Sequence, residues 1–345
     1  MALIPTTILT GFLGAGKTTL LNRILQEPHG FRIAVIENEF GPENIDNEIL
    51  VQDSSEQIIE MNNGCICCTV RGDLIVGLTA LAARRDAGEL QFDRLVIETT
   101  GLANPGPVAQ TFFIDDAVAS QYMLDAVITV VDANHAMQQL DDHEEAQRQI
   151  GFADRILISK SDLVSEEAMQ RLTARIQRIN PRAAIGKSAF GMTPISEILD
   201  IRGFNLNDKL DIDPAFLSEE EDHDHDHDHD HDCDEHAGHD HHRSGHTDDI
   251  KAFVFKSLRA FDTARLDDFL GGLVQVYGPR MLRYKGVLAV DGADRKVLFQ
   301  GVHQIMGSDI GARWGDTEKR ESKLVFIGKN LPEEIFIHGL EQCLV

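Results

Sequence analysis

A glycine-rich segment near the N-terminus carries the residues best suited to chemistry. Residues 11–18 read GFLGAGKT and match the pattern GxxxxGK[ST], between an apolar run and an amphipathic stretch. Glycines at this spacing let backbone N–H groups turn toward phosphate oxygens, and the N-terminus of the following helix adds partial positive charge. We expect the Lys17 ammonium to reach the β- and γ-phosphates and the Thr18 hydroxyl to ligate Mg²⁺. The pattern predicts a nucleoside triphosphate site whose binding residues are Gly11, Gly14, Ala15, Gly16, Lys17, Thr18 and Thr19.

A second group of polar residues follows the apolar run at 92–97. Glu98 ends this run and Gly101 comes three residues later, in the sequence LVIETTG. A carboxylate here suits the Mg²⁺ shell or its waters, and a glycine lets a backbone N–H approach the γ-phosphate. Asp132, which closes the apolar run 125–131, is either a cap at the strand end or part of the nucleotide site. The expected catalytic residues are Lys17, Thr18 and Glu98.

The tetrad SKSD at Ser159–Asp162 follows a further apolar run and indicates which base is bound. The Asp162 carboxylate can accept two hydrogen bonds, from guanine N1 and its exocyclic amine, while the stem of Lys160 packs across the ring. Adenine offers no such pair of donors, and a site built on hydrogen bonds rejects the wrong partner by roughly 10⁴-fold. Serine in place of asparagine at the first position removes an amide, which weakens affinity without changing base identity. The tetrad predicts that the nucleotide is GTP.

Three of the five cysteines lie within four positions, in the sequence NGCICC. Cys65, Cys67 and Cys68 bring three thiols into one tight loop, which is typical of a soft-metal site. Three ligands do not close a tetrahedral shell, so a fourth must come from elsewhere, and Glu37 and Glu39 are candidates. We expect such a site to exchange its metal ion, unlike a structural site that is closed by four ligands from the protein. Ordinary packed cysteines and a redox pair remain open alternatives, and either glutamate can be a solvated strand end.

The segment 218–249 has a composition unlike the rest of the chain. Acids at 219–222 lead into an alternating His-Asp run, and ten of the fifteen histidines lie in this segment. Such charge density cannot bury apolar area, so we expect a disordered linker. Neutral imidazoles bind Zn²⁺, Ni²⁺ or Co²⁺, which predicts metal binding by this linker. A merely solubilising acidic spacer is the alternative.

The elements that must position these residues alternate between apolar strands and amphipathic helices. With 345 residues, 42% of them hydrophobic, the chain is long enough for two domains. The N-terminal alternation, which includes a single helix at 134–150, predicts an α/β fold with the doubly wound sheet of P-loop NTPases. Beyond the linker, strands and a helix at 266–277 predict a small α+β domain. We expect a GTPase domain at 1–212, the linker at 213–249 and a C-terminal domain at 250–345.

The bulk composition argues against several protein classes. The formal net charge of −25 lacks the basic footprint that nucleic acid requires. No apolar run reaches 18 residues, and no basic n-region precedes the P-loop strand, so we expect neither a membrane partner nor a signal peptide. Five cysteines, three of them within four positions, favour metal chemistry in a reducing cytoplasm over a disulfide framework. Whether the chain forms a homo-oligomer stays open.

The motifs GFLGAGKTT, VIENEFG, NGCICC, LVIETTG and SKSD, in this order, resemble those of the CobW-type P-loop GTPases and look closest to the YjiA-like branch. The resemblance covers nearly the whole chain outside the His-Asp segment. It implies a slow GTPase that binds GTP or GDP, Mg²⁺ and Zn²⁺ (or Co²⁺) and delivers metal to client metalloproteins. It also implies that Cys67 and Glu37 are metal ligands. Members of the branch often carry an acid directly after EFG, whereas this chain has Pro42 there and Glu43 next.

Two function classes remain open. The first is an enzyme, a metallochaperone whose GTP hydrolysis gates metal transfer from Glu37 and the loop 65–68 to a client. The second is a binding module, a nucleotide-responsive metal buffer without a dedicated client. A cobalt-handling role in cobalamin synthesis is a further alternative that the resemblance implies. His303, in the C-terminal region, is either a ligand or client contact or a core histidine.

Overall fold

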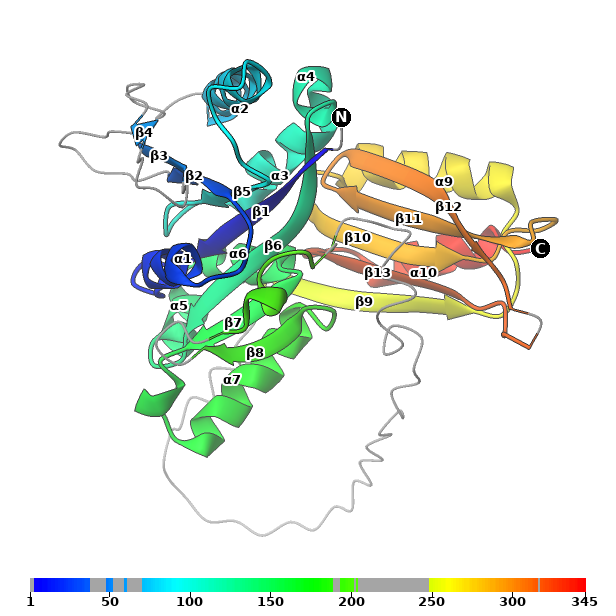
Figure 1. Cartoon of the computed structure of the whole chain (residues 1–345). Helices are drawn as coiled ribbons and strands as arrows, with labels where there is room; N and C mark the ends of the chain where they lie inside the picture. The colour runs from blue at the N-terminus through cyan, green and yellow to red at the C-terminus, as the bar shows by residue number, and fades with distance from the viewer. Residues whose placement is uncertain are drawn as a thin grey trace, which may run out of the picture.

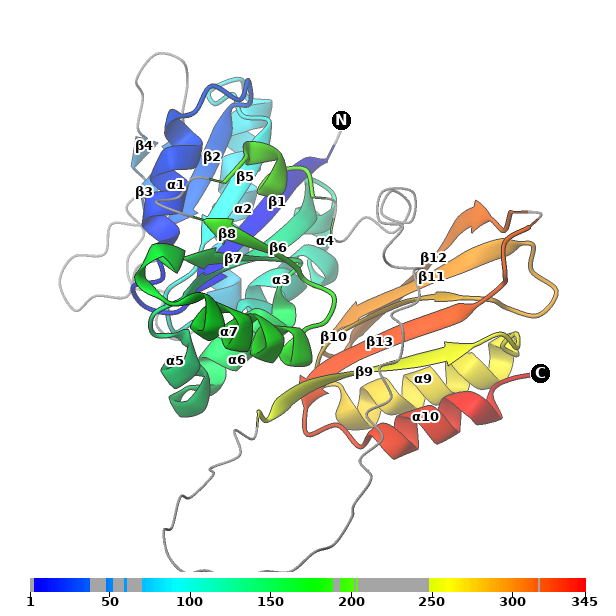
Figure 2. The same cartoon turned by 90° about the horizontal axis from the view of Figure 1, so that it is seen from below.

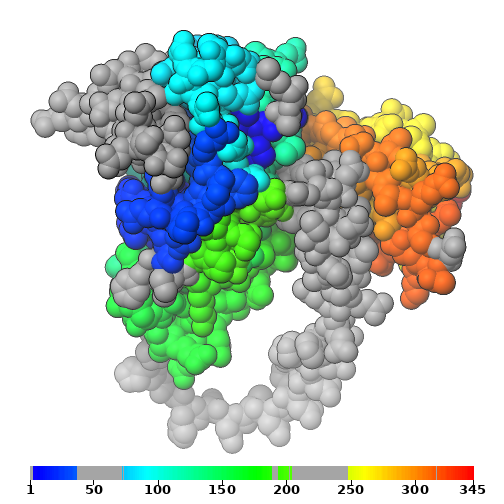
Figure 3. Space-filling view, in the orientation of Figure 1, coloured from blue at the N-terminus to red at the C-terminus, as the bar shows by residue number. Residues whose placement is uncertain are grey.

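The computed structural model describes residues 3–37, 48–51, 59–60, 70–188, 193–201, 203, 248–315 and 317–345, and every structural statement below concerns these residues. Two bodies lie next to each other, an N-terminal one coloured blue to green and a C-terminal one coloured yellow to red (Figure 3). Glu39, Cys65, Cys67, Cys68 and most of the predicted linker fall outside the described residues.

The N-terminal body is built on one sheet, whose described strands follow the order β4-β3-β2-β5-β1-β6-β7-β8 (Figures 1 and 2). Strands β2, β5, β1, β6, β7 and β8 run parallel, whereas β3 and β4 pair antiparallel at one edge. The elements are β1 (Ile4–Gly11), α1 (Lys17–Gln26), β2 (Ile33–Glu37), β3 (Glu48–Val51), β4 (Ile59–Glu60), α2 (Val70–Asp86), β5 (Arg94–Glu98), α3 (Pro105–Ile114), α4 (Asp116–Ala119), β6 (Tyr122–Asp132), α5 (Ala136–Asp142), α6 (Glu144–Phe152), β7 (Arg155–Ser159), η1 (Ser161–Leu163), α7 (Glu166–Ile179), β8 (Ala184–Ser188) and η2 (Ile195–Glu197).

Both faces of this sheet are covered, which explains why its strands are apolar throughout. On β1, Ile8 belongs to the core cluster that α2, α3, α6 and α7 share, whereas its neighbour Leu9 belongs to the cluster that α1 shares. Successive side chains of a strand point to opposite faces, so one strand contributes to both clusters. The doubly wound α/β fold predicted from the sequence is confirmed.

Capping chemistry sets where the helices that flank the site begin. α3 starts after Asn104, whose side chain accepts a hydrogen bond from the Gly106 N–H, and Pro105 occupies its first turn. α7 starts after Ser165, whose hydroxyl accepts a hydrogen bond from the Ala168 N–H. The cap of α3 fixes the chain just after the predicted γ-phosphate segment.

The prediction of a single helix at 134–150 is wrong. The structure has two helices, α5 and α6, with His143 between them in an extended conformation at φ −135° and ψ 115°. The Nε2 of Gln147 donates to the carbonyl oxygen of Leu140 at 2.8 Å, across the junction. A break in a helix leaves carbonyl groups without their helical partners, and here the buried Gln147 amide satisfies one of them. Such a hydrogen bond leaves no mark in the helical pattern of residues, so the pattern did not reveal the break.

The C-terminal body is a sheet of the order β12-β11-β10-β13-β9 among its described strands, antiparallel throughout. Helices α9 and α10 cover one of its faces (Figure 1). The predicted α+β domain is therefore present, and it also contains β12 and α10, which were not among the predicted elements. No helix in the described ranges is long and apolar enough to cross a membrane. The elements are β9 (Ile250–Ser257), α9 (Thr263–Tyr277), β10 (Met281–Leu288), β11 (Arg295–Val302), β12 (Ile305–Arg313), β13 (Ser322–Lys329) and α10 (Glu333–Gln342).

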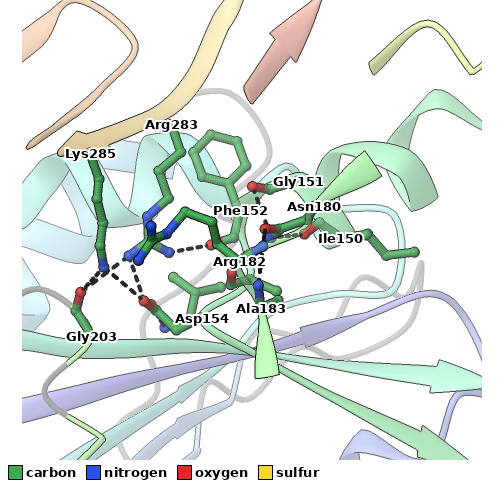
Figure 4. Close-up of polar contacts among 12 residues, drawn as sticks. Ile150, Gly151, Phe152, Asp154, Asn180, Arg182, Ala183, Gly203, Arg283 and Lys285 are labelled. Atoms are coloured by element: carbon green, nitrogen blue, oxygen red, sulfur yellow. Dashed lines mark hydrogen bonds and ion pairs between the residues drawn. The ribbon is translucent and has the colours of Figure 1, made fainter. Parts of the chain in front are cut away.

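A mixed apolar and polar interface joins the two bodies. Arg283 on β10 donates from Nη2 to the Asp154 carboxylate at 2.5 Å and from Nη1 to the Phe152 carbonyl oxygen at 2.8 Å (Figure 4). The side chains of Arg283 and Asp154 are only 6% and 2% exposed, so this ion pair is buried. The C-terminal residues that join the core cluster of the N-terminal sheet are Ile250, Leu282, Val302, Val325 and Ile327.

Candidate functional site

The segment between β1 and α1 closes around the Lys17 side chain. Gly11, Gly14 and Gly16 have φ values of 143°, 71° and 100°, which L side chains rarely adopt. Lys17 is 8% exposed, and its Nζ donates to the Gly11 carbonyl oxygen at 2.9 Å. Burial lowers the pKa of Lys17, and the nearby Glu98 carboxylate acts in the opposite direction. The glycine-rich loop therefore surrounds the Lys17 ammonium with main-chain groups, which places a positive charge where a phosphate would bind.

Glu98, at the end of β5, lies beside this loop. The Thr18 hydroxyl donates to Glu98 Oε1 at 3.0 Å. Glu98 is buried, whereas Thr18 is exposed and open to a ligand. A hydroxyl and a carboxylate are hard oxygen ligands of the kind that Mg²⁺ prefers. This pair of oxygens fits a Mg²⁺ ion at the place where the sequence analysis expects one.

Gly101 lies directly against the P-loop. A Cβ atom at this position would lie 2.7 Å from the backbone nitrogen of Leu13, so the close approach requires glycine. The Nε2 of Gln149 on α6 donates to the carbonyl oxygens of Gly101 and Ala103, both at 3.1 Å. No motif in the sequence pointed to Gln149. Its only sign in the sequence was that a polar residue, Gln149, stands next to the apolar Ile150 in the predicted helix.

Ser159 and Lys160 bring the end of β7 onto the P-loop. The Ser159 hydroxyl donates to the Ala15 carbonyl oxygen at 2.7 Å, and Lys160 Nζ donates to the Gly14 carbonyl oxygen at 2.9 Å. Lys160 has a left-handed φ of 53°, and the chain turns there into η1, where Asp162 is exposed. The carboxylate predicted to read guanine is therefore accessible. Ser159 connects the strand to the loop, and no feature of the sequence indicated this contact.

Asp132 combines the two interpretations that the sequence left open. Its Oδ1 accepts a hydrogen bond from the Asn134 N–H at 3.0 Å, which caps the turn after β6. Its Oδ2 accepts one from Lys160 Nζ at 2.7 Å and lies 2.9 Å from His135 Nδ1. Burial raises the pKa of Asp132, but the hydrogen bonds from Lys160 and His135 outweigh it, so the net shift is downward. Asp132 both caps its own turn and holds the lysine of the SKSD tetrad.

Of the predicted metal ligands, only the backbone of Glu37 falls within the described residues. Glu37 ends β2 and pairs in parallel register with Glu98 of β5. The register thus places a candidate metal ligand and a candidate Mg²⁺ ligand on adjacent strand ends. Cys65, Cys67 and Cys68 lie outside the described residues. Within the part of the chain that the structure describes, no group of three or more His, Cys, Asp or Glu side chains is placed to hold a metal ion.

The fold and the site together define a class of protein. A doubly wound, mainly parallel sheet, a glycine-rich loop around a buried lysine, and a threonine–glutamate pair beside it characterise the P-loop nucleotide-binding proteins. Residues 5–187 match the CobW/HypB/UreG nucleotide-binding domain, and residues 250–344 match the cobalamin synthesis protein cobW C-terminal domain. The chain belongs to the CobW family, which confirms the resemblance inferred from its motifs.

Similarity to individual members extends through both bodies. The chain is 40% identical over 332 residues to the zinc chaperone YjiA of Escherichia coli, covering 96% of each protein. It is 35% identical over 376 residues to the zinc chaperone CobW of Pseudomonas aeruginosa, covering 100% of this chain and 92% of that protein. The crystal structure of the Zn(II)-bound YjiA GTPase from E. coli matches with a TM-score of 0.77 at 35% sequence identity, covering 100% of both chains.

Proposed function

We propose that this protein is a GTPase that binds zinc and transfers it to client metalloproteins. One observation carries the proposal: Glu98, hydrogen-bonded to Thr18 beside the P-loop, is the register neighbour of Glu37, the candidate metal ligand. Similarity to the zinc chaperone YjiA, and to the crystal structure of the Zn(II)-bound YjiA GTPase, supports both the GTPase activity and the zinc binding. The ligands are then GTP or GDP, Mg²⁺ and Zn²⁺, with Co²⁺ or Ni²⁺ as alternative cargo.

GTP hydrolysis moves the γ-phosphoryl group to water, and catalysis rests on positioning and charge more than on covalent chemistry. Lys17 lies inside the glycine-rich loop, from which it would neutralise the β- and γ-phosphates. Thr18 and Glu98 would hold Mg²⁺, directly or through its waters, and that ion would supply charge neutralisation. Lys160 and Asp162 would hold the guanine base. A site with these parts and no further activator is expected to turn over slowly.

The metal half of the proposal rests on Glu37 and the cysteine loop with Cys65, Cys67 and Cys68. Because Glu37 and Glu98 end adjacent strands, a γ-phosphate and Mg²⁺ next to Glu98 would change the surroundings of Glu37. Binding linkage is reciprocal, so Zn²⁺ must then change the affinity for GTP by the same factor, typically about 5- to 150-fold. The nucleotide state would thereby decide when the metal is released.

The proposal extends to the organisation and location of the chain. We divide it into a GTPase domain at 1–212, a histidine-rich linker at 213–249 that supplies additional metal ligands, and a C-terminal domain at 250–345. A cytoplasmic location is proposed because thiolates bind metal only where they stay reduced. The client is a metalloprotein and not a nucleic acid, given the net charge of −25.

The test combines GTP turnover with Zn²⁺ titration in the presence of GDP or a non-hydrolysable GTP analogue. We expect GTP hydrolysis by the wild type, and a Zn²⁺ affinity that differs between the two nucleotide states. Cys67→Ala should weaken the tight zinc site, whereas Cys343→Ala, which removes a buried cysteine of the C-terminal body, should not. Equal Zn²⁺ affinity in both states would contradict the linkage. Many weak metal equivalents without a stable complex with an apo metalloenzyme would favour a metal buffer instead.

A further inference from the structure

One buried glutamine outside the predicted site contacts the segment that carries Gly101. Gln149 is 1% exposed, and its Nε2 donates to the carbonyl oxygens of Gly101 and Ala103, both at 3.1 Å. A side-chain amide has two N–H donors, so these bonds use its full donor capacity. The two carbonyls flank Leu102, so a single amide fixes the whole turn between β5 and α3.

The same turn also contacts the P-loop. The close approach of Gly101 to the backbone nitrogen of Leu13 leaves no room for a Cβ atom. Just before the turn, the Thr99 N–H donates to the Leu9 carbonyl oxygen at 2.9 Å, and just after it Asn104 caps α3. The backbone of residues 101–103 is therefore held between the P-loop strand and the Gln149 amide.

Helix α6, which carries Gln149, is itself anchored to both bodies. The Thr129 hydroxyl of β6 donates to the Gln149 carbonyl oxygen at 2.7 Å. On the other side, Gln147 Oε1 accepts a hydrogen bond from the first N–H of β9 at 3.2 Å. The Phe152 carbonyl oxygen accepts one from Arg283 at 2.8 Å (Figure 4). A side chain that positions a loop has to stand on a fixed element, and α6 meets this condition.

We propose that Gln149 is a positioning residue for GTP hydrolysis: it sets the backbone of residues 101–103 so that the Gly101 N–H is aimed at the γ-phosphate. This inference rests on the proposed GTPase function. Gln149 does not touch the nucleotide in this arrangement and acts through the turn. Gln149 therefore affects the hydrolysis of GTP and not the binding of GDP, because GDP lacks the γ-phosphate that the Gly101 N–H would contact. A misplacement of about 1 Å at such a contact lowers a rate by roughly 10²-fold.

The experiment compares Gln149→Met with Gln147→Met in the full-length chain. Methionine keeps the length of glutamine and removes the amide. Gln147 is a matched control, since it lies on the same helix, is 7% exposed, and makes its bonds to Leu140 and β9 instead of to the Gly101 turn. The measurements are kcat and KM for GTP, the single-turnover rate of GTP hydrolysis, Kd for GDP and Tm. Gln149→Asn, which keeps the amide on a shorter stem, provides a milder second variant.

We expect Gln149→Met to lower kcat roughly 10- to 100-fold with KM for GTP and Kd for GDP nearly unchanged. Gln149→Asn should give an intermediate kcat, and Gln147→Met should lower Tm while leaving kcat close to the wild-type value. Equal kcat for both methionine variants, or a matching loss of GDP affinity in Gln149→Met, would overturn the inference and leave Gln149 a structural residue. No hydrolysis by the wild type would overturn the proposed function itself, and the inference with it.

Discussion

Lys160 shows how much of this site depends on single side chains that bridge distant parts of the sequence. Its Nζ contacts Gly14, a residue 146 positions away along the chain, and the Asp132 carboxylate at a neighbouring strand end. The backbone adopts the left-handed conformation at this residue, which non-glycine residues rarely do. Such strain concentrates where a structure must aim a side chain, and here it aims the lysine at the mouth of the P-loop.

At the residue scale, Asp162→Asn tests the specificity for guanine. The amide presents a donor where guanine already presents one, whereas xanthine presents an acceptor there. We expect the roughly 10⁴-fold discrimination in favour of guanine to be lost and xanthine nucleotides to bind instead. Competition between GDP and XDP for the protein measures this. Asp268→Asn, at an exposed acid of α9, is the control and should bind GDP normally. Equal binding of ATP and GTP by the wild type would count against the whole assignment.

At the element scale, the turn between β11 and β12 places His303 at the start of α3. The ring of His303 lies edge-on to the Phe152 ring at a centroid distance of 5.4 Å, and a Cβ atom on Gly106 would lie 2.6 Å from its Nε2. His303 has a positive φ of 52°. Among the described residues its Nδ1 has no hydrogen-bond partner. His303 is half-buried between the two bodies, which favours a packing role over a ligand role and gives it an interdomain position that the sequence did not indicate.

His303 predicts a pH dependence of stability. Burial lowers the pKa of His303 below its usual 6.5 and outweighs the backbone groups of Gly278, Pro279 and Met281, which raise it, while the positive charge of Arg148 lowers it further. The unfolded chain therefore binds this proton more readily than the folded one. Well above the usual pKa of 6.5, His303 is neutral in both states and does not lower the unfolding free energy. As the pH falls below 6.5, the unfolded chain takes up the proton first, so the unfolding free energy decreases. We expect His303→Asn, which tolerates a positive φ, to show a smaller loss of stability between about pH 7 and pH 5 than the wild type.

Chemical unfolding at several pH values measures this difference. Replacement of His338, an exposed histidine of α10, is the control and should leave the wild-type slope unchanged. A slope that is identical in wild type and His303→Asn would show that other groups carry the acid sensitivity.

At the scale of the whole molecule, buried polar contacts hold the two bodies in one arrangement. Besides the Arg283–Asp154 pair, Arg175 on α7 donates from Nη2 to the Asp248 carboxylate at 2.6 Å, where the C-terminal body begins. The side chains of this second pair are 1% and 8% exposed. Lys329 and Glu144 form a third contact at 2.5 Å, but both are 32% exposed. Buried pairs fix orientation because a displaced partner leaves an uncompensated charge.

Arg283→Met should destabilise the native arrangement strongly. The change removes the guanidinium from the buried Asp154 carboxylate, while the Lys285 ammonium stays 3.6 Å away. We expect a loss of about 3 kcal/mol in the free energy of unfolding. Lys329→Met breaks a half-exposed pair and should lose less than about 1 kcal/mol. Urea unfolding measures both, and similar losses for the two variants would show that burial does not distinguish these contacts.

Deleting residues 219–246 tests the contribution of the histidine-rich segment. Ten histidines lie between the ends of this deletion, and imidazoles are the commonest metal ligands. We expect fewer bound metal ions per chain and an almost unchanged rate of GTP hydrolysis, because the P-loop residues are untouched. Metal equivalents measured by titration and GTP turnover per folded molecule give the answer. A large fall in turnover would show that the segment takes part in the nucleotide cycle.

The sequence by itself determined the family to which the chain belongs, through short motifs from which its chemistry is predicted. GxxxxGK[ST], LVIETTG and SKSD each combine residue types and spacing that a phosphate, a metal ion or a base imposes, so they are legible without the fold. The apolar runs likewise predicted the parallel sheet, since strands covered on both faces must be apolar. Helix 134–150 was misjudged because a hydrophobic period does not register a break that a side-chain hydrogen bond stabilises.

Only the tertiary structure decided which distant residues meet. Gln149 reaches Gly101 across 48 positions of sequence, Ser159 reaches Ala15 across 144, and the register of β2 with β5 sets Glu37 beside Glu98. None of these contacts has a local signature, because a hydrogen bond between remote segments depends on how the strands are ordered and how helices pack on them. The physical reason is that motifs report what a ligand demands of a few neighbouring residues, whereas positioning is a property of the packed sheet.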